Sequence, residues 1–365
     1  MAKIVVLDEV VKENLLKSML KDRFAQLAFG LLVVLYAAVF FASFISPYSK
    51  DYSNRHMAYA PPSRLYIIDE SGRLSWPYTY NYTREFDSQN YKITYKQDRS
   101  VKYYVKYFAK GEKYKLFGIL PCDRHFYNVD KGGNIYLLGT DINGRDNFSR
   151  LLYGGRISLT IGFLALFVSF PLGMLYGGIS GYFGGKIDFL MMRLAEAIMS
   201  IPSFYLLIIL ASILPANMTS IQRFTLIILI LALIGWAGFS RVVRGMVLSI
   251  KKQEFVQATE SLGASKLRVI TRHILPQTIS YVIVAMTLSV PSYILAESGL
   301  SFLGLGIQQP DASWGNMLKE AQEFANIISR PWLLTPGFLI FVAVLSFNLI
   351  GDTIRDVLDP KSKVR

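Results

Sequence analysis

The residue types that carry out catalysis are few in this chain of 365 residues. Its three histidines are widely separated, at His56, His125 and His273, and its single cysteine is Cys122. One cysteine permits no internal disulfide, and these four residues form neither a Cys/His cluster for a metal nor a Cys/His/acid set for a nucleophile. The sequence therefore predicts no catalytic residues and no metal site.

The segment that comes nearest to a phosphate-binding loop is Gly184-Gly185-Lys186. A P-loop has a further glycine five residues before its Gly-Lys pair, and a Ser or Thr after the lysine to bind magnesium. Those positions hold Ser180 and Ile187 here. We therefore expect the chain to bind no cofactor and to take its energy from another protein.

Charged residues inside apolar sequence are the remaining candidates for chemistry. Arg193 and Glu196 stand three residues apart near the start of an apolar run. On a helix this spacing places them on one face, where they can pair instead of entering lipid alone. An ion-coupling carboxylate is the alternative, but no second intramembrane acid accompanies Glu196. The pattern favours a pair.

The composition is typical of a membrane protein, because 52% of the residues are hydrophobic and only 18% are charged. The formal net charge is +13. The Lys and Arg residues gather outside the apolar runs, which fits loops at a membrane surface and not a groove for nucleic acid. We expect membrane lipid, not nucleic acid, as a partner.

Six apolar runs reach the ~20 residues that a helix needs to cross a bilayer. They cover residues 24–46, 157–182, 189–214, 224–248, 276–299 and 332–355. No small-residue cleavage site follows the first run, so it is interpreted as a retained span and not as a signal peptide. The predicted fold class is an all-α polytopic membrane protein with six transmembrane helices. Pro171, Pro202 and Pro291 lie near the middles of runs, where they favour kinks or close packing.

The basic residues predict which side of the membrane each end occupies. Residues 1–23 form a predicted cytoplasmic segment that holds Lys3, Lys12, Lys17, Lys21 and Arg23. Six crossings would return the carboxyl end to the same side, where the predicted tail 358–365 holds Lys361, Lys363 and Arg365. Both termini are therefore expected in the cytoplasm, as is the loop 254–276.

Residues 47–138 contain no apolar run and are rich in Tyr, Lys and Arg. Alternating pieces at 92–95 and 101–105 favour strands. Turn signals stand at Pro61-Pro62, Ser71-Gly72, Lys110-Gly111 and Gly132-Gly133. We predict a small, mostly β, extracytoplasmic insert between the first two helices. It serves either as a platform for a partner or as a cap over loops.

Residues 254–276 interrupt two apolar runs with a charged, amphipathic stretch. The pattern predicts a helix over 254–262, which Gly263 ends in a left-handed conformation. Ser265 is placed to cap a second helix. The chain is thus expected to leave the membrane, present one short helix and return.

This stretch resembles the EAA loop of ABC-transporter permease subunits. Gly263 and Ile274-Leu275-Pro276 match that pattern, whereas the triplet reads Gln257-Ala258-Thr259 and departs from it at two of three positions. The resemblance implies that the short helix docks into a groove on an ATP-hydrolysing partner. The residues that it assigns to this coupling are Glu254, Gln257, Ala258, Thr259, Leu262, Gly263, Ala264 and Pro276.

Residues 139–156, expected as an interfacial segment, continue into a run that reads GTDINGRDNFSRLLYGGRISL. This closely resembles the GTD-x-x-GRD-x-x-SR-x-x-YG-x-RISL signature of the C-type permease subunits of dipeptide and oligopeptide importers. Residues 297–315 and 351–360 resemble further segments of that family. The matching residues are Gly139, Thr140, Asp141, Gly144, Arg145, Asp146, Ser149, Arg150, Glu297, Gly304, Gly306 and Trp314. Among them, Trp314 is expected, like Trp332, at the membrane interface.

The resemblance implies a permease core over 157–357 in a prokaryotic inner membrane. Its expected partners are a second homologous permease, two ATP-binding-cassette ATPases that hold ATP and magnesium, and an extracytoplasmic substrate-binding protein. Di- or oligopeptides are the expected cargo, with nickel chelates or modified peptides as alternatives. The substrate-binding residues stay unknown.

Two other classes of protein remain open. A secondary transporter needs ion-coupling groups near the membrane midplane and usually an internal repeat, neither of which the sequence shows. A membrane-anchored receptor would use the Tyr-rich insert for sensing and the loop 254–276 for signalling.

Overall fold

The computed structural model describes residues 22–88, 92–116, 119–215 and 217–358. Most of the predicted amino-terminal segment and of the predicted tail therefore lies outside the described residues. The helices are α2 (Arg23–Phe40), α3 (Ala42–Ile45), α4 (Asn147–Phe183), α5 (Gly185–Met199), α6 (Ser203–Ser212), α7 (Ser220–Ile250), α8 (Glu254–Ser261), α9 (Lys266–Val269), α10 (Ile279–Phe302), α11 (Trp314–Leu318), α12 (Phe324–Ser329) and α13 (Thr335–Leu358). Short 3-10 or π turns are η1 (Arg55–Met57), η2 (Ile270–Ile274), η3 (Leu275–Thr278), η4 (Lys319–Gln322) and η5 (Pro331–Leu334).

Five helices among the described residues are long and apolar enough to cross a membrane. They are Arg23–Phe40, Asn147–Phe183, Ser220–Ile250, Lys266–Phe302 and Pro331–Leu358. The helices α5 and α6 pass the same test as a pair, which makes up to six spans. The structure therefore confirms a mostly helical architecture with five or six candidate membrane helices.

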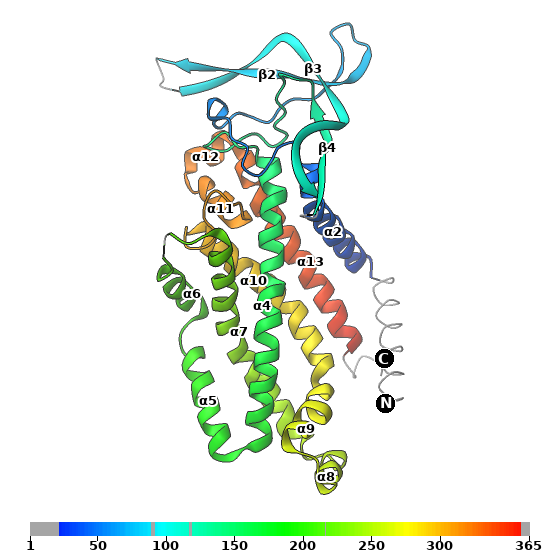
Figure 1. Cartoon of the computed structure of the whole chain (residues 1–365), viewed down its shortest axis with the longest axis vertical. Helices are drawn as coiled ribbons and strands as arrows, with labels where there is room; N and C mark the ends of the chain where they lie inside the picture. The colour runs from blue at the N-terminus through cyan, green and yellow to red at the C-terminus, as the bar shows by residue number, and fades with distance from the viewer. Residues whose placement is uncertain (1–21, 89–91, 117–118, 216, 359–365) are drawn as a thin grey trace. The chain divides into compact units, whose positions relative to one another are not determined.

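The predicted run 189–214 is not one straight helix. The helix α5 ends at Met199, α6 begins at Ser203, and the two are bent by 79° at the break between them (Figure 1). Pro202 lies at this break as the N-cap of α6, where a residue without an N–H cannot continue the helical hydrogen bonds. Pro171 and Pro291, by contrast, lie inside the continuous helices α4 and α10.

The chain forms two compact units. We call one the helical unit; it contains Leu159–Leu300 with the segments before Val34 and after Ile340. The other, the sheet-bearing unit, contains Val34–Ser158 and Ser301–Ile340. Each unit is described separately below.

Small residues bring α4 and α7 into backbone contact within the helical unit. A Cβ added at Gly177 would lie 2.3 Å from the carbonyl oxygen of Ser240, and one added at Gly181 would lie 2.8 Å from that of Arg244. The two glycines are four residues apart and so lie on one face of α4. We call this contact the glycine seam; only residues without side chains let helices approach so closely.

An ion pair joins α5 to α7 beside the seam. Arg244 donates from Nε to Oδ1 of Asp188 and from Nη2 to Oδ2, both at 2.5 Å. Ser180 of α4 donates its hydroxyl to the same carboxylate. This geometry is bidentate, which fixes the guanidinium as well as its charge. The helices α4, α5 and α7 are thus joined at one end (Figure 1).

The sheet of the second unit has four antiparallel strands in the order β1-β2-β3-β4. They are β1 (Tyr66–Ile68), β2 (Leu74–Asp87), β3 (Lys92–Leu116) and β4 (Leu120–Val129). The predicted small β insert is therefore present as a sheet. Its turns at Gly72 and Gly132 are confirmed, since both glycines have positive φ and N–H groups of Gly72 and Gly133 close the turns.

The turn predicted at Lys110-Gly111 is wrong. Both residues lie inside the long strand β3, where the register to β4 shifts between Lys110 and Tyr114. A Cβ at Gly111 would lie 2.5 Å from Cδ2 of His125. The glycine therefore serves the close approach of a ring across an irregular strand pair and not a reversal of the chain.

The glycine seam yields a stability prediction. Gly177→Ala is expected to lower the thermal unfolding midpoint in detergent, because overpacking of this kind costs about 1–3 kcal/mol. The matched control is Gly245→Ala in α7, where an added Cβ meets no atom within 4 Å. Equal midpoints for the two variants would show that α4 and α7 do not need this contact.

Candidate functional sites

The loop between α7 and α10 has the predicted helix and stop. The helix α8 covers Glu254–Ser261, Leu262 is its C-cap, and Gly263 follows with φ +80°. Gly263 therefore has the left-handed conformation that ends a helix. Ser265 occupies the N-cap of α9, but its side chain makes no capping hydrogen bond, so the predicted capping interaction is wrong.

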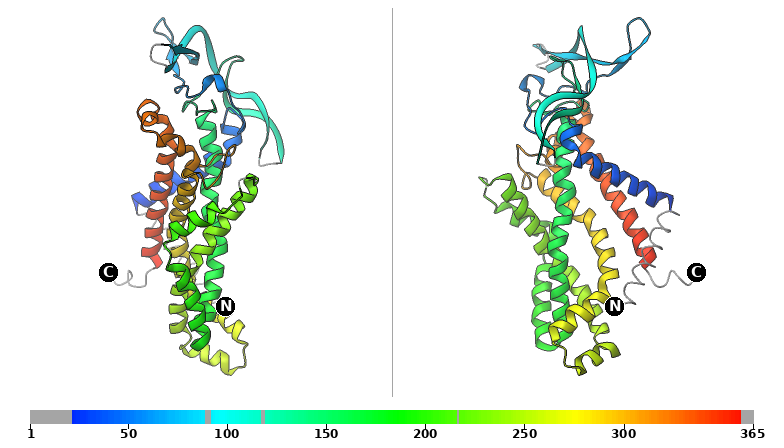
Figure 2. Two further views of the ribbon diagram at one scale, coloured as in Figure 1. Left: turned by 90° about the vertical axis from the view of Figure 1, so that its left-hand side faces the viewer. Right: turned by 45° about the vertical axis from the view of Figure 1, so that its right-hand side comes forward.

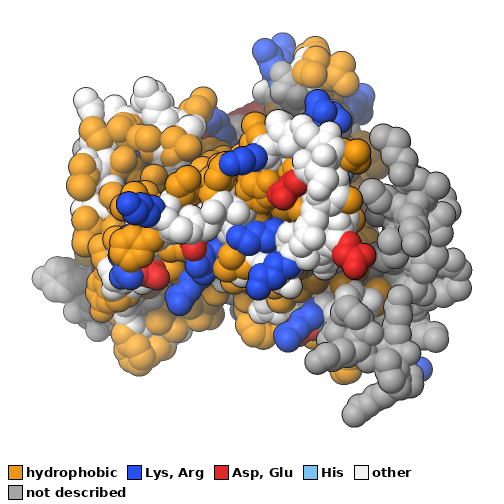
Figure 3. Space-filling model, turned by 90° about the horizontal axis from the view of Figure 1, so that it is seen from below, with side chains coloured by type: hydrophobic (Ala, Val, Ile, Leu, Met, Phe, Trp, Pro, Cys, Tyr) orange, Lys and Arg blue, Asp and Glu red, His pale blue; other side chains and the backbone are white. Residues whose placement is uncertain are grey.

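The loop exposes apolar side chains that a folded chain usually buries. Leu262 is 87% exposed, and Phe255 and Leu267 are exposed as well, whereas Val256 is fully buried. The remaining predicted coupling residues divide by exposure: Glu254, Gln257, Ala258 and Gly263 are exposed, and Thr259, Ala264 and Pro276 are half-buried. Figure 3 shows this end of the molecule, where Lys and Arg side chains lie among hydrophobic ones.

Three contacts hold this loop against the end of α4. Lys251 donates its ammonium to the carbonyl oxygens of Gly181 at 2.8 Å and Tyr182 at 3.3 Å. The Tyr182 hydroxyl donates to the Glu260 carboxylate. The Lys266 ammonium lies 5.4 Å from the centre of the Phe183 ring. A displacement of α8 must therefore break these contacts or move the end of α4.

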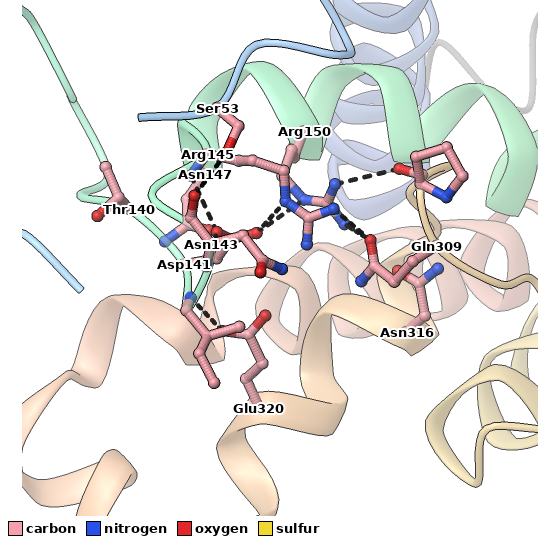
Figure 4. A network of polar contacts seen from close by, with 12 residues as sticks. Ser53, Thr140, Asp141, Asn143, Arg145, Asn147, Arg150, Gln309, Asn316 and Glu320 are labelled. Atoms are coloured by element: carbon pink, nitrogen blue, oxygen red, sulfur yellow. Dashed lines mark hydrogen bonds and ion pairs between the residues drawn. The ribbon is translucent and has the colours of Figure 1, made fainter. Parts of the chain in front are cut away.

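The second candidate site is a buried polar cluster in the sheet-bearing unit, drawn in Figure 4. The Arg145 Nε donates to Oδ2 of Asp141 at 2.6 Å, and the Arg150 Nε lies 3.4 Å from the same oxygen. Gln309 accepts from both guanidinium groups through Oε1. All three charged residues are buried. One carboxylate thus neutralises part of the charge of two arginines, which removal from water makes necessary.

Asp146 lies directly before α4 in this region. Its Oδ2 accepts from the Ser149 backbone N–H at 2.8 Å and from the Ser149 hydroxyl at 2.6 Å. Complete burial nevertheless raises the pKa of the Asp146 carboxyl to about 7, and the charge of Asp141 adds to this shift. Its Oδ1 is buried without a partner among the described residues. A protonated carboxyl suits this environment better than a carboxylate.

Glu320 extends the cluster from the turn η4. Its carboxylate accepts from the backbone N–H of Ile142 at 3.1 Å, and burial raises its pKa to about 7. Gly139, Thr140 and Gly144 tie the same loop to residues 54–60. Thr140 Oγ1 accepts from the Ala60 N–H at 2.7 Å, and a Cβ at Gly144 would lie 1.8 Å from the Asn54 oxygen.

The segment 301–315 reaches the polar cluster through the Pro310 oxygen, which accepts from Nη1 of Arg150 at 3.4 Å. Gly304 has φ +78°, and a Cβ at Gly306 would lie 2.2 Å from Oγ of Ser301. Trp314 faces protein within this unit, since its side chain is fully buried and its Nε1 donates to the Leu151 oxygen at 2.9 Å. Its expected place at the membrane interface stays a prediction. The ring fills space beside Gly155 of α4, where no larger residue fits.

Other predicted residues have separate positions. Glu297 is fully buried in the helical unit and accepts from the Ser298 hydroxyl at 3.4 Å. Arg193 and Glu196 form the predicted pair, with Nη1 3.1 Å from Oε2. Sequence reasoning did not identify Gln309 and Glu320 as members of the cluster. Gln309 stands beside the matching Pro310, which was a usable signal, whereas Glu320 lies beyond every recognised segment.

A cavity of about 380 Å³ opens within the helical unit. Its lining is mostly apolar, with hydroxyl groups from Ser289, Ser292 and Tyr293. Tyr293 also shares a hydrogen bond of 3.0 Å with Ser169. An apolar cavity with a few polar groups is suited to an organic ligand.

These features define a polytopic membrane protein with an exposed amphipathic loop. A family model described as "Binding-protein-dependent transport system inner membrane component" matches residues 169–364. A second, described as "N-terminal TM domain of oligopeptide transport permease C", matches residues 14–62. The chain therefore belongs to the family of binding-protein-dependent transport system inner-membrane components and is a permease subunit. The residues between the two matches, 63–168, include the sheet.

Individual relatives agree with this assignment. Over 225 residues the chain is 44% identical to the dipeptide transport system permease protein DppC of Bacillus subtilis, covering 61% of this chain and 68% of the relative. It is 43% identical over 229 residues to the oligopeptide transport system permease protein OppC of Haemophilus influenzae, covering 62% and 71%. It is 38% identical over 251 residues to the glutathione transport system permease protein GsiD of Escherichia coli, covering 67% and 80%.

The buried carboxyl of Asp146 generates a pH prediction. Its pKa is about 7 in the folded chain and about 3.9 when unfolded. The folded state therefore holds more protons between these values, and the free energy of unfolding falls as the pH rises through this window. Asp146→Asn keeps an acceptor for Ser149 and is expected to reduce this fall, measured as the unfolding midpoint between about pH 5 and pH 8.

The control for this prediction is Asp98→Asn. Hydrogen bonds from Ser100 lower the pKa of the Asp98 carboxyl, which lies at the surface. Asp98→Asn is therefore not expected to reduce the fall in the free energy of unfolding as the pH rises. A pH dependence in Asp146→Asn as steep as in the original chain would contradict the assignment. Burial also raises the pKa of the Glu320 carboxyl. We therefore expect some pH dependence of the unfolding midpoint to remain in Asp146→Asn.

Proposed function

We propose that this permease subunit forms, with a second homologous permease, the membrane pathway of an ATP-binding-cassette importer for di- or oligopeptides. The names of the relatives support this cargo, since two are named for dipeptides and oligopeptides. The relative named for glutathione favours modified peptides as a second candidate. An extracytoplasmic binding protein would deliver the cargo, and two ATPase subunits with ATP and magnesium would supply the energy.

The observation that carries the proposal is the exposure of α8 together with its attachment to α4. Phe255, Leu262 and Leu267 offer apolar area at the surface of a loop, which marks a surface for a protein partner. The contacts of Lys251, Tyr182 and Lys266 connect that surface to the end of α4. Closure of two ATPases would push α8 as a lever, and the seam between α4 and α7 would carry the motion into the membrane.

We propose a coupling role for all eight loop residues that the family resemblance assigns to it. Their exposure makes Glu254, Gln257, Ala258 and Leu262 available to a partner directly. The other four, Thr259, Gly263, Ala264 and Pro276, shape the helix end and the return of the chain. The Thr259 hydroxyl donates to the Phe255 oxygen at 2.7 Å, so this position acts within the helix. The polar cluster has a different role, because its buried ion pairs hold the loop before α4 in place.

The topology follows from counting the bent pair α5 and α6 as one broken span. Six crossings then leave both termini in the cytoplasm and the sheet outside. On this count, 24–46 is the first span, 47–138 the extracytoplasmic insert and 139–156 the segment at the membrane surface. Residues 157–357 form the core with the loop 254–276. The cavity beside Tyr293 would form part of the wall of the substrate pathway.

The lever role is tested by Gly263→Leu. A leucine at φ +80° costs roughly 1–2 kcal/mol and favours extension of α8 through its stop. With the partners reconstituted in vesicles, peptide uptake is expected to fall severalfold or more while ATP hydrolysis and membrane insertion persist. The measurements are uptake of labelled peptide, ATP hydrolysis and the amount of inserted chain.

The matched control is Gly72→Leu in the sheet. Gly72 has φ +76° and open space around it, so the backbone cost is similar while α8 is untouched. Uptake in this variant is expected to equal that of the original chain. Full uptake by Gly263→Leu would count against the lever.

A further inference from the structure

An aromatic patch lies where the β3–β4 hairpin meets β2 and α3, and all of its residues except Phe44 lie outside both segments that the family models match. It consists of Phe44 in α3, Trp76 in β2, and Tyr107, Phe108 and Phe126 on the hairpin. The ring of Phe126 lies 5.9 Å from Tyr107, 6.0 Å from Phe44 and 6.1 Å from Phe108. Trp76 is nevertheless 59% exposed and Phe108 56% exposed. The rings form a continuous surface and do not fill a core.

The core of the hairpin lies on the opposite side of β4. His125 and Tyr127 are buried, and Phe126 between them is exposed, as the alternation of a strand requires. Tyr127 packs in a small core with Val105 and Ile135. The aromatic patch is therefore a second apolar surface, in addition to the one that stabilises the sheet.

The backbone at Phe108 is unusual for a bulky residue. Its φ is +52°, a conformation rarely taken by large side chains. The Phe108 oxygen accepts from the Arg124 guanidinium at 3.1 Å. This conformation presents the ring to the surface beside Phe126 and Phe44.

The patch is continuous with the end of a candidate membrane helix. Phe44 belongs to α3, which follows directly after α2, and its ring lies 5.9 Å from Phe108. Phe40 and Phe41 at the end of α2 are exposed as well. The His125 Nδ1 lies 2.6 Å from the Ser46 oxygen, which anchors the hairpin to this exit. The hairpin lies beside the end of α2 in Figures 1 and 2.

Basic side chains lie on the hairpin that carries most of the aromatic patch. Lys113, Lys115 and Arg124 are exposed there, and Arg124 contacts the patch through the Phe108 oxygen. Aromatic rings favour the boundary between headgroups and acyl chains, and Lys and Arg favour the headgroups. A soluble partner would explain the exposed rings, but not their continuity with the lipid-exposed end of α2.

We propose that the β3–β4 hairpin rests in the outer headgroup layer of the membrane, where Phe108 and Phe126 of the hairpin and Trp76 of the neighbouring strand β2 enter the boundary with the acyl chains. The lipid surface is the partner of the aromatic patch. The inference rests on the proposed topology, in which α2 crosses the membrane and the sheet lies outside, and it gives the insert a role separate from transport. The hairpin is a membrane anchor that holds the sheet at the exit of α2.

The single cysteine of the chain provides the test. Cys122 lies in β4 four residues before Phe126, and its side chain is half-buried. A nitroxide on Cys122 of the full chain in lipid nanodiscs can be probed with oxygen, which concentrates in lipid, and with a water-soluble nickel chelate. The control is Cys122→Ser with Phe86→Cys, because Phe86 is 60% exposed and lies near the end of β2, where it pairs with Ile93 of β3.

The expected result is stronger relaxation by oxygen than by nickel at residue 122 and the reverse at residue 86. Phe108→Ser with Phe126→Ser is expected to shift the ratio at residue 122 toward nickel. Strong nickel relaxation at residue 122 of the original chain would place the hairpin in water and overturn the proposal. Weak relaxation by both reagents would show a protein partner on the patch and overturn it equally.

Discussion

Backbone contact between α4 and α7 is the constraint on which the helical unit depends. Gly177 and Gly181 place α4 against carbonyl groups of α7, and the bidentate pair of Arg244 with Asp188 joins α5 at the same end. Because α7 leads directly into the loop that carries α8, the loop begins on a rigid support. Lys251 binds the start of this loop to the end of α4 by donating to the Gly181 oxygen. The exposed helix is thus an extension of the packed helices and not a free segment.

The sheet-bearing unit depends on a different kind of interaction. Asp141 holds two buried arginines, and Asp146 and Glu320 accommodate burial by an increase in pKa. Such a cluster is costly unless each charge has a partner or becomes neutral. Its members come from the loop before α4 and from 309–320, so it fixes how these segments meet. The residues of the family signature GTD-x-x-GRD therefore have a structural role: they fix the loop at the start of α4.

Much of this could be predicted from local sequence. Gly263 as a helix stop, the apolar runs, the pair of Arg193 with Glu196 and the presence of strands all depend on neighbours within a few residues. The burial of Trp314, the place of Gly111 inside a strand and the contact of Arg244 with Asp188 depend on residues far along the chain. Pro202 indicated a weak point in its run, but local sequence does not set an angle of 79° between α5 and α6.

The proposed mechanism requires that α8 binds an ATPase partner. The most direct measurement is to tag the carboxyl end, extract the chain from its own host in mild detergent and identify by mass what stays bound. We expect a second permease and one or two kinds of ATPase with phosphate-binding loops, and we expect the ATPases, but not the second permease, to be lost when Leu262 and Phe255 are replaced by Asp. Recovery of the chain alone, or with signalling proteins and no ATPase, would contradict it.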